Sequence, residues 1–339
     1  MALLEVEHLH VQLQTHRGPA YAVRDVSFTL ERGETLGLVG ESGCGKSITA
    51  MALMGLLPES AQVSGSIRFE GEELTAKSDA AMGDIRGNRI GMIFQEPMTA
   101  LNPVHTIGDQ VAEPLRLHRG MAAAQARKEA IALLDRVGIP DAARRIDAYP
   151  HQFSGGQRQR ITIAMALACG PQLLIADEPT TALDVTIQRQ ILELIRDLVA
   201  ERGMALMLIS HDLGVIAQNV RRMLVMYGGS VVESGTTASV FEHRIHPYTL
   251  GLFGARPGLH SLKGQRLATI AGSVPELVDL PAGCPFAGRC GYTAPECHAT
   301  FPPALEIEPG HRARCIRLDV VAADRGLQFA QAKAEDSPA

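Results

Sequence analysis

The sequence predicts an α/β fold built around a parallel sheet. Five short apolar runs each end at polar or glycine-rich residues, and helical stretches lie between them. The runs are nearly continuous rather than alternating, which is typical of strands covered on both faces. They cover residues 35–39, 90–94, 173–176, 205–209 and 223–227. Alternation of strand and helix is the pattern of an α/β core.

The helices between these strands are expected at residues 47–57, 122–137, 156–168 and 186–201. In open parallel sheets, ligands bind beyond the carboxyl ends of the strands. Several of the predicted strands are followed directly by polar residues, which would lie at that same edge of the sheet. These residues are Gln95, Asp177, Glu178 and His211.

The length of 339 residues suggests about two domains. Residues 1–255 are expected to form the α/β domain, with a mostly helical insert at about 96–168. Proline and glycine become frequent from about residue 256 onward, and four of the six cysteines cluster in this part, between 284 and 315. A C-terminal extension is therefore expected at 256–321, followed by a flexible tail at 322–339.

Composition argues against a nucleic-acid partner and against a membrane span. The net charge is −5, and aromatic residues make up only 4% of the chain, with no Trp. No apolar stretch reaches the roughly 18 residues that a spanning helix needs. The N-terminus lacks the basic and apolar pattern of a secretory signal. We expect a soluble, cytosolic chain.

A glycine-rich motif follows the first predicted strand. Residues 40–47 read GESGCGKS and fit the pattern G-x4-G-K-S/T, in which backbone N–H groups surround phosphate oxygens. Lys46 is expected to reach the β- and γ-phosphates, and Ser47 to bind Mg²⁺. A chance glycine-rich turn is the alternative, but the strand before and the helix after favour phosphate binding. The backbone contacts are expected from Gly40, Ser42, Gly43, Cys44 and Gly45.

The acidic pair after the 173–176 run suits phosphate hydrolysis. Asp177 is placed to contact Mg²⁺, and Glu178 to orient and deprotonate the attacking water. The pair could instead simply close the strand. His211 alone is more often structural, and Gln95 alone is a polar strand end; their positions after core strands favour a role at the site.

Four cysteines near the end form the pattern C-x5-C-x6-C-x17-C. Four thiolates can hold Zn²⁺ or an iron–sulfur cluster. Zinc modules usually show closer cysteine pairs, and buried free thiols or disulfides remain alternatives. The four residues are Cys284, Cys290, Cys297 and Cys315.

Residues 153–157 read FSGGQ and resemble the LSGGQ signature of ABC ATPases, in the place where that family has it. The resemblance covers about residues 4–240. It implies that Gln95 is the Q-loop glutamine and an Mg²⁺ contact, Asp184 the D-loop aspartate, and His211 the switch histidine on the γ-phosphate. Ser154, Gly155 and Gly156 are expected to open a helix and so to form a second anion site. The resemblance implies that this site, together with Gln157, binds the ATP held by a partner chain. A plain helix cap is the alternative.

The C-terminal part resembles the oligopeptide/dipeptide importer ATPases within that family. The similarity lies in the segments HPYT at 246–249 and PAGCPFAGRC at 281–290, and ESG at 41–43 in the phosphate loop is also similar. It implies a four-iron–four-sulfur cluster on the four clustered cysteines. It also implies ATP-driven peptide import at the cytoplasmic face of a bacterial membrane, with two permease subunits and a substrate-binding protein. A related second ATPase chain is the expected partner, and a homodimer is the alternative.

Other functions remain open at this stage. Similar importers carry nickel chelates, glutathione or sugars, and soluble ABC ATPases act on DNA or ribosomes. The signature and His211 argue against a P-loop kinase of small molecules.

Two details of the phosphate site can also be anticipated. The residue that stacks on adenine could be His16, Arg17 or Tyr21. The Cys44 thiol lies near a predicted helix N-terminus, which is expected to lower its pKa, so alkylation there should block nucleotide binding.

Overall fold

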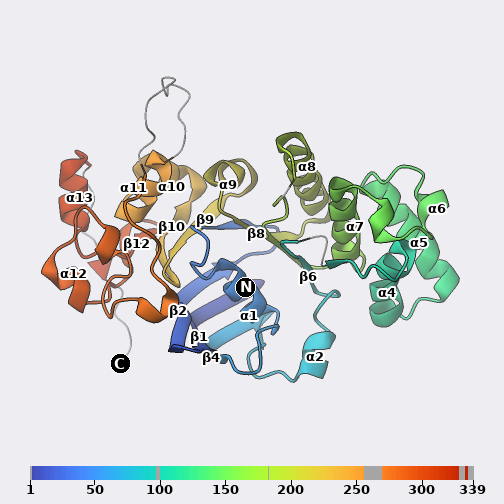
Figure 1. The fold of residues 1–339 in the computed structure, drawn as a ribbon, viewed down its shortest axis with the longest axis horizontal. Helices are drawn as coiled ribbons and strands as arrows, with labels where there is room; N and C mark the ends of the chain where they lie inside the picture. The colour runs from blue at the N-terminus through green and yellow to red at the C-terminus, as the bar shows by residue number, and fades with distance from the viewer. Residues whose placement is uncertain (1, 97–99, 182, 256–268, 328–332, 335–339) are drawn as a thin grey trace.

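The computed structural model describes residues 2–96, 100–181, 183–255, 269–327 and 333–334. Two sheets form its centre, with a group of helices at one end and the C-terminal region at the other (Figure 1).

The larger sheet contains the five predicted strands, and all of them run parallel as expected. Their order across the sheet is β9, β3, β8, β7 and β6. Their bounds are Arg222–Tyr227, Thr35–Val39, Ala205–Ser210, Leu173–Asp177 and Ile90–Ile93. Beyond β9, the sheet continues with antiparallel strands, so it is mixed rather than purely parallel. These are β10 (Ser230–Thr236), β12 (His311–Ala313), β11 (Leu305–Glu308) and β13 (Lys333–Ala334).

Successive residues of the central strands face two different hydrophobic cores. In β8, Leu206 and Leu208 belong to the core with helices α7 (Gly155–Leu167) and α8 (Val185–Arg202). Met207 and Ile209 belong to the core with α1 (Lys46–Leu53) and the smaller sheet. This two-sided burial is the physical reason why the strands read as continuous apolar runs.

The smaller, antiparallel sheet covers one side of the molecule. Its strands, in spatial order, are β2 (Gly18–Leu30), β1 (Leu4–Thr15), β4 (Gln62–Phe69) and β5 (Glu72–Glu73). It packs against helix α1 (Lys46–Leu53), which follows β3. The short helix α2 (Asp79–Gly83) then leads to β6.

The expected helical insert contains α4 (Ile107–Arg119), α5 (Ala123–Arg136), α6 (Ala142–Arg145) and α7 (Gly155–Leu167), gathered at one end in Figure 1. Helix α7 begins at Ser154 because Ser154 and Gln157 form a reciprocal capping box. On the same face of the large sheet lie α8 (Val185–Arg202) and α9 (Leu213–Asn219).

The C-terminal region follows α10 (Thr237–His243) and α11 (Pro247–Gly254). The expected boundary near 256 falls at residues 256–268, which lie outside the described residues. The region then holds short 3₁₀ turns at Leu277–Asp279 and Ala287–Arg289, and helices α12 (Pro295–Ala299) and α13 (Leu318–Asp324). Helix α13 extends into the segment expected to be a flexible tail from 322. Among the helices that the structure describes, none combines the length and apolar character of a membrane span.

Candidate active site

The glycine-rich loop lies between β3 and α1, as its motif predicts. Gly43 and Gly45 adopt φ angles of 81° and 103°, and a Cβ on Gly45 would lie 2.4 Å from the carbonyl oxygen of Ala22. Both a positive φ and a close backbone approach therefore require glycine at position 45. The loop amides and the start of α1 together form an anion-binding turn.

Lys46 points into this loop. Its side chain is nearly buried, and its Nζ donates hydrogen bonds to the carbonyl oxygens of Gly40, at 2.8 Å, and Glu41, at 3.1 Å. An ammonium group held inside this loop is placed to contact phosphate oxygens.

Asp177 ends β7 next to the start of α1. Burial raises the pKa of its carboxyl, although the Ser47 hydroxyl donates a hydrogen bond to it. Its Oδ1 atom is buried and has no hydrogen-bond partner among the described residues. An orphaned carboxylate oxygen beside a hydroxyl fits the oxygen ligands that Mg²⁺ prefers.

Glu178 gathers the polar residues that follow the neighbouring strands. Its Oε2 accepts a hydrogen bond from Gln95 Nε2 at 3.4 Å and from Thr181 Oγ1 at 3.1 Å, and it lies 3.2 Å from His211 Nδ1. Of the four residues expected at one sheet edge, Gln95, Glu178 and His211 meet here, and Asp177 directly precedes Glu178 at the end of β7.

The backbone at Glu178 has an uncommon conformation. Its φ angle is 44°, and its amide donates to the carbonyl oxygen of Ile209 at 3.0 Å. A non-glycine residue held at positive φ marks local strain, which is frequent at functional sites.

The signature residues form a separate group. Ser154 Oγ accepts from the Gln157 amide at the start of α7, and Asp184 Oδ1 accepts from the Ile187 amide at the start of α8. A Cβ on Gly156 would lie 2.8 Å from Ile187 Cγ2, so glycine lets the two helix starts approach. In Figure 1, α7 packs with the insert helices, away from α1. Within one chain, the structure does not bring the signature to the phosphate loop.

The expectation of a lowered Cys44 pKa is wrong. Its thiol is only 1% exposed, and this burial raises its pKa, because a buried thiolate loses its hydration. The nearby Lys46 ammonium, with Nζ 3.8 Å from Cys44 Sγ, does not offset that effect.

Sequence reasoning missed a contact between the C-terminal region and the phosphate loop. Arg289 donates to both carboxylate oxygens of Glu41, at 2.8 and 3.2 Å, and its side chain is 7% exposed. The Glu41 amide donates to Tyr248 Oη at 2.8 Å. The only signal in the sequence was that Tyr248 and Arg289 lie in the segments that carry the importer resemblance.

The four clustered cysteines line one small cavity, together with Phe286 and Ile316. All six cysteines of the chain are described, and all are free thiols rather than disulfides. Burial raises the pKa of Cys284 to about 11 and that of Cys315 to about 12. Cys290 Sγ accepts a hydrogen bond from the Tyr292 amide, and Cys315 Sγ from the Arg317 amide.

The candidates for the adenine contact differ in their surroundings. Arg17 forms ion pairs with Glu276 and Asp279 of the C-terminal region, both at 2.7 Å. Tyr21 is 48% exposed on β2.

Comparison with known proteins identifies the family. Residues 23–181 match the family described as ABC transporter, and residues 232–297 match the oligopeptide/dipeptide transporter C-terminal region. The chain is 51% identical to the dipeptide transport ATP-binding protein DppD of Bacillus subtilis, over 92% of this chain and 94% of that protein. It is 48% identical to the oligopeptide transport ATP-binding protein OppD of Mycobacterium tuberculosis, over 99% of this chain but 55% of that protein.

A solved ATP-binding cassette, described as a dimer in a post-hydrolysis state bound to ADP and Pi, has a similar fold. It is 28% identical, with a TM-score of 0.62, over 69% of this chain and 98% of that chain. The chain therefore belongs to the ABC transporter family of ATPases, and it carries the C-terminal region of the oligopeptide/dipeptide transporters.

Proposed function

We propose that this chain is the ATP-hydrolysing subunit of an importer that drives peptide uptake through separate permease subunits. One observation carries the hydrolytic part: Gln95 and His211 converge on Glu178 at the sheet edge that also holds the phosphate loop. The names of the relatives, which are dipeptide and oligopeptide transport proteins, support the peptide part. Residues 1–255 would form the nucleotide-binding domain and 256–321 the extension.

The phosphate loop binds the triphosphate. Loop amides between Gly40 and Ser47 donate to the phosphate oxygens, and Lys46 supplies positive charge at the β- and γ-phosphates. Ser47, Asp177 and Gln95 would hold Mg²⁺, which neutralises charge on the phosphates when bound.

Glu178 prepares the attack on the γ-phosphate. Its carboxylate accepts the hydrogen bond of the water and takes up the proton as the water attacks. His211 lies beside it and can donate to the γ-phosphate oxygens. Gln95 holds the same carboxylate from the other side and follows β6, which leads into the helical insert.

A partner chain completes the site. The signature residues, including Ser154 and Gly155, are exposed at the start of α7 and can close over ATP held by another cassette. We propose a related second ATPase as that partner, with a homodimer as the alternative. The assembly would lie at the cytoplasmic face of the bacterial membrane, with two permease subunits and a substrate-binding protein.

The hydrolytic role is tested with Glu178→Gln in the transporter purified with its partners. We expect the ATPase rate to fall by about a hundredfold or more, because the base is lost, while ATP remains bound. Glu59→Gln, at an exposed position away from the site, is the control and should leave the rate unchanged. Full activity of Glu178→Gln would refute the assignment of the base.

The cargo is tested by uptake into vesicles that contain the complete importer. ATP-dependent accumulation of labelled di- and oligopeptides is expected, and it should be absent with Glu178→Gln. Uptake of nickel chelates or glutathione in place of peptides would reject the peptide assignment but leave the ATPase assignment intact. Co-purification with nucleic acid instead of membrane subunits would reject transport.

We also propose that the four clustered cysteines hold a four-iron–four-sulfur cluster, in a structural or regulatory role. Their common cavity and the two amide hydrogen bonds to sulfur support it. Within the described residues, no three of these sulfur atoms lie within 4.8 Å of one another. Four thiolates on a single zinc ion would be about 3.8 Å apart.

The test is iron and sulfide analysis of the chain purified without oxygen. A brown protein with equal iron and sulfide is expected, and Cys297→Ser should lose both. Cys169→Ser, a buried cysteine outside the cavity, should keep both. A colourless protein with one zinc ion that Cys297→Ser removes would overturn the iron assignment.

A further inference from the structure

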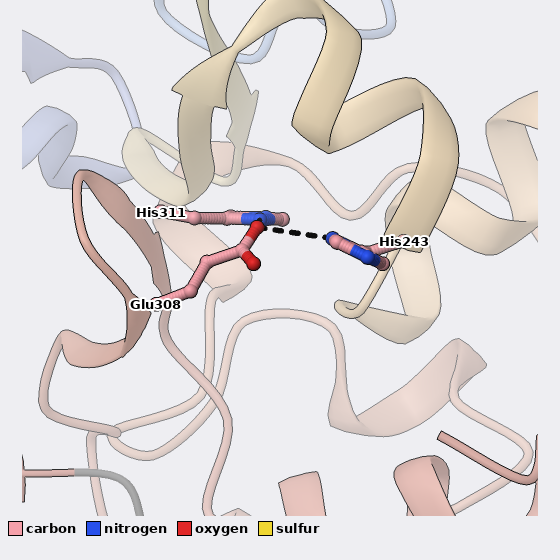
Figure 2. Close-up of side chains that lie close together, drawn as sticks. All are labelled: His243, Glu308 and His311. Atoms are coloured by element: carbon pink, nitrogen blue, oxygen red, sulfur yellow. Dashed lines mark hydrogen bonds and ion pairs between the residues drawn. The ribbon is translucent and has the colours of Figure 1, made fainter. Parts of the chain in front are cut away.

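A second group of potential metal ligands lies where helix α10 meets the β11–β12 hairpin of the C-terminal region. His243 is the last residue of α10, Glu308 ends β11, and His311 begins β12 (Figure 2). One ligand atom from each residue lies within 4.8 Å of the other two. No step of ATP hydrolysis uses these residues.

The fold builds this group from parts that are far apart in sequence. A tight turn at Pro309 and Gly310, where Gly310 has a φ of 77°, pairs Glu308 with His311 across the β11–β12 hairpin. Strand β12 pairs with β10, which leads directly into α10, so the hairpin lies beside the end of that helix. His243, at the end of α10, thus lies next to Glu308 of the hairpin.

The distances suit a small divalent ion. Glu308 Oε1 lies 3.0 Å from His243 Nδ1 and 3.1 Å from His311 Nδ1. Two ligands at about 2.0–2.1 Å from a tetrahedral Zn²⁺ would be about 3.3 Å apart. Imidazole nitrogens with one carboxylate favour zinc-like ions over Mg²⁺ or Ca²⁺, which prefer all-oxygen sites.

A buried carboxylate orients the central histidine. His311 Nε2 lies 2.8 Å from Glu233 Oε1, and both side chains are at most 1% exposed. The backbone amides of Ile245 and His246 each donate to a Glu233 carboxylate oxygen at 2.9 Å and hold it in place. In the neutral tautomer that donates from Nε2 to Glu233, His311 Nδ1 would be left to bind a metal ion on the side of Glu308. A carboxylate that holds the far nitrogen of a ligating histidine is a common feature of zinc sites.

A proton or a metal ion can fill the space between His311 and Glu308. A doubly protonated His311 donates from Nε2 to Glu233 and from Nδ1 to Glu308, which lies 3.1 Å away. Ser239 Oγ lies 2.6 Å from His311 Nδ1 and donates to Glu308 Oε1. A divalent cation would take the place of the Nδ1 proton.

We propose that His243 Nδ1, His311 Nδ1 and Glu308 Oε1 bind a zinc-type divalent cation, with Ser239 Oγ or a water in the fourth position. The ion ties the β11–β12 hairpin to α10. Cys315 follows β12 within two residues, so the ion would also hold this part of the cysteine cavity in place.

The test measures zinc on the full chain after chelator treatment and dialysis against Zn²⁺. Wild type is expected to retain one more equivalent than His243→Ala and Glu308→Gln. His105→Ala, an exposed histidine elsewhere, should bind as wild type does. Circular dichroism and melting in chelator check that each variant folds, and Zn²⁺ should raise the melting temperature more in wild type than in His243→Ala.

Co²⁺ separates this site from the cysteines. Cobalt bound by thiolates shows an intense sulfur-to-metal absorption band, which a nitrogen and oxygen site lacks. The equivalent lost in His243→Ala should therefore leave any such band unchanged. Equal zinc content in wild type, His243→Ala and Glu308→Gln overturns the proposal. It is also overturned if the cobalt lost in His243→Ala is accounted for entirely by a loss of the sulfur-to-metal band.

Discussion

At the scale of single residues, the phosphate loop shows how burial changes a cysteine. Cys44 lies directly before Gly45 and Lys46 at the helix start, a setting that normally favours the thiolate. Yet its side chain is almost fully enclosed, and desolvation outweighs the helix end and the Lys46 charge. A position in sequence therefore predicts the backbone geometry of this loop but not the reactivity of its thiol.

We expect Cys44 to react slowly with iodoacetamide at pH 7.5. Because the thiolate is disfavoured and the sulfur is enclosed, its alkylation should be at least about tenfold slower than in the same chain unfolded in guanidinium. Peptide mass spectrometry of timed samples measures this directly. Equal rates in the folded and unfolded chains would contradict the burial argument.

At the scale of elements, the C-terminal region reaches the phosphate loop through one arginine. The 3₁₀ turn Ala287–Arg289 lies between two of the cavity cysteines and carries the guanidinium that holds Glu41. Tyr227, Tyr248 and Phe286 pack together beneath this contact, with ring centroids 4.6 to 5.4 Å apart. A change in the cysteine cavity can therefore shift Arg289 and, through it, the position of the phosphate loop.

Arg289→Ala is expected to raise the KM for ATP by about three- to tenfold, since the phosphate loop loses a paired, nearly buried anchor. The value of kcat should change less, because Arg289 touches no reacting group. Arg289→Lys keeps the charge but cannot form the bidentate hydrogen bonds to Glu41, so its KM should lie between those of wild type and Arg289→Ala.

A double-mutant cycle shows whether Arg289 acts through Glu41. If it does, the KM effects of Arg289→Ala and Glu41→Gln will not add in the double variant. Fully additive effects would mean that the ion pair does not position the loop.

The β4–β5 pair contains an acid-sensitive contact. Burial alone would raise the pKa of Glu73, but hydrogen bonds from Ser66, Thr75 and the Ile67 amide lower it to about 2, from 4.5. A carboxyl with a depressed folded pKa stabilises the fold above its unfolded pKa, and this contribution disappears as pH falls from 4.5 toward 2.

Glu73→Gln should therefore reduce stability at pH 7 and matter progressively less below pH 4.5. Urea unfolding of wild type and variant, compared at several pH values, measures the difference in free energy of unfolding. A difference that stays constant, or grows, on acidification would contradict the assignment.

The elements that could be read from the sequence share one property. The five parallel strands and the helices after them have strong, local apolar patterns, and their observed bounds differ from the predicted ones by a few residues. The smaller sheet was not predicted, because β1 and β2 alternate buried and exposed residues irregularly around bulges. The Arg289–Glu41 contact joins residues 248 positions apart, and no local pattern encodes such a pairing.

At the scale of the whole molecule, the candidate site is divided between two surfaces of the chain. The phosphate loop, Glu178 and His211 lie where the parallel strands of the large sheet end. Helix α7, whose start is exposed, lies with the insert helices at the end of the molecule (Figure 1). Motif order in the sequence predicted both groups of residues. That they stay apart within one chain is a property of the fold, and under the proposed function it makes association of two cassettes the condition for hydrolysis.

Ser154→Arg in the Glu178→Gln background tests this condition. Glu178→Gln should form an ATP-dependent dimer, either alone or with the partner ATPase, which sedimentation detects. Adding Ser154→Arg should leave binding of a fluorescent ATP analogue to the monomer intact but abolish the dimer, because the bulky charge fills the anion site at the start of α7. Ala124→Arg introduces the same charge at an exposed position on α5, away from the start of α7, and should dimerise normally.

The same condition predicts how the activity of the wild-type chain depends on its concentration. Its specific ATPase activity should rise as its concentration passes through the range in which it associates. Activity that is independent of concentration in samples shown to be monomeric would mean that one chain suffices, and that the start of α7 serves only to cap its helix.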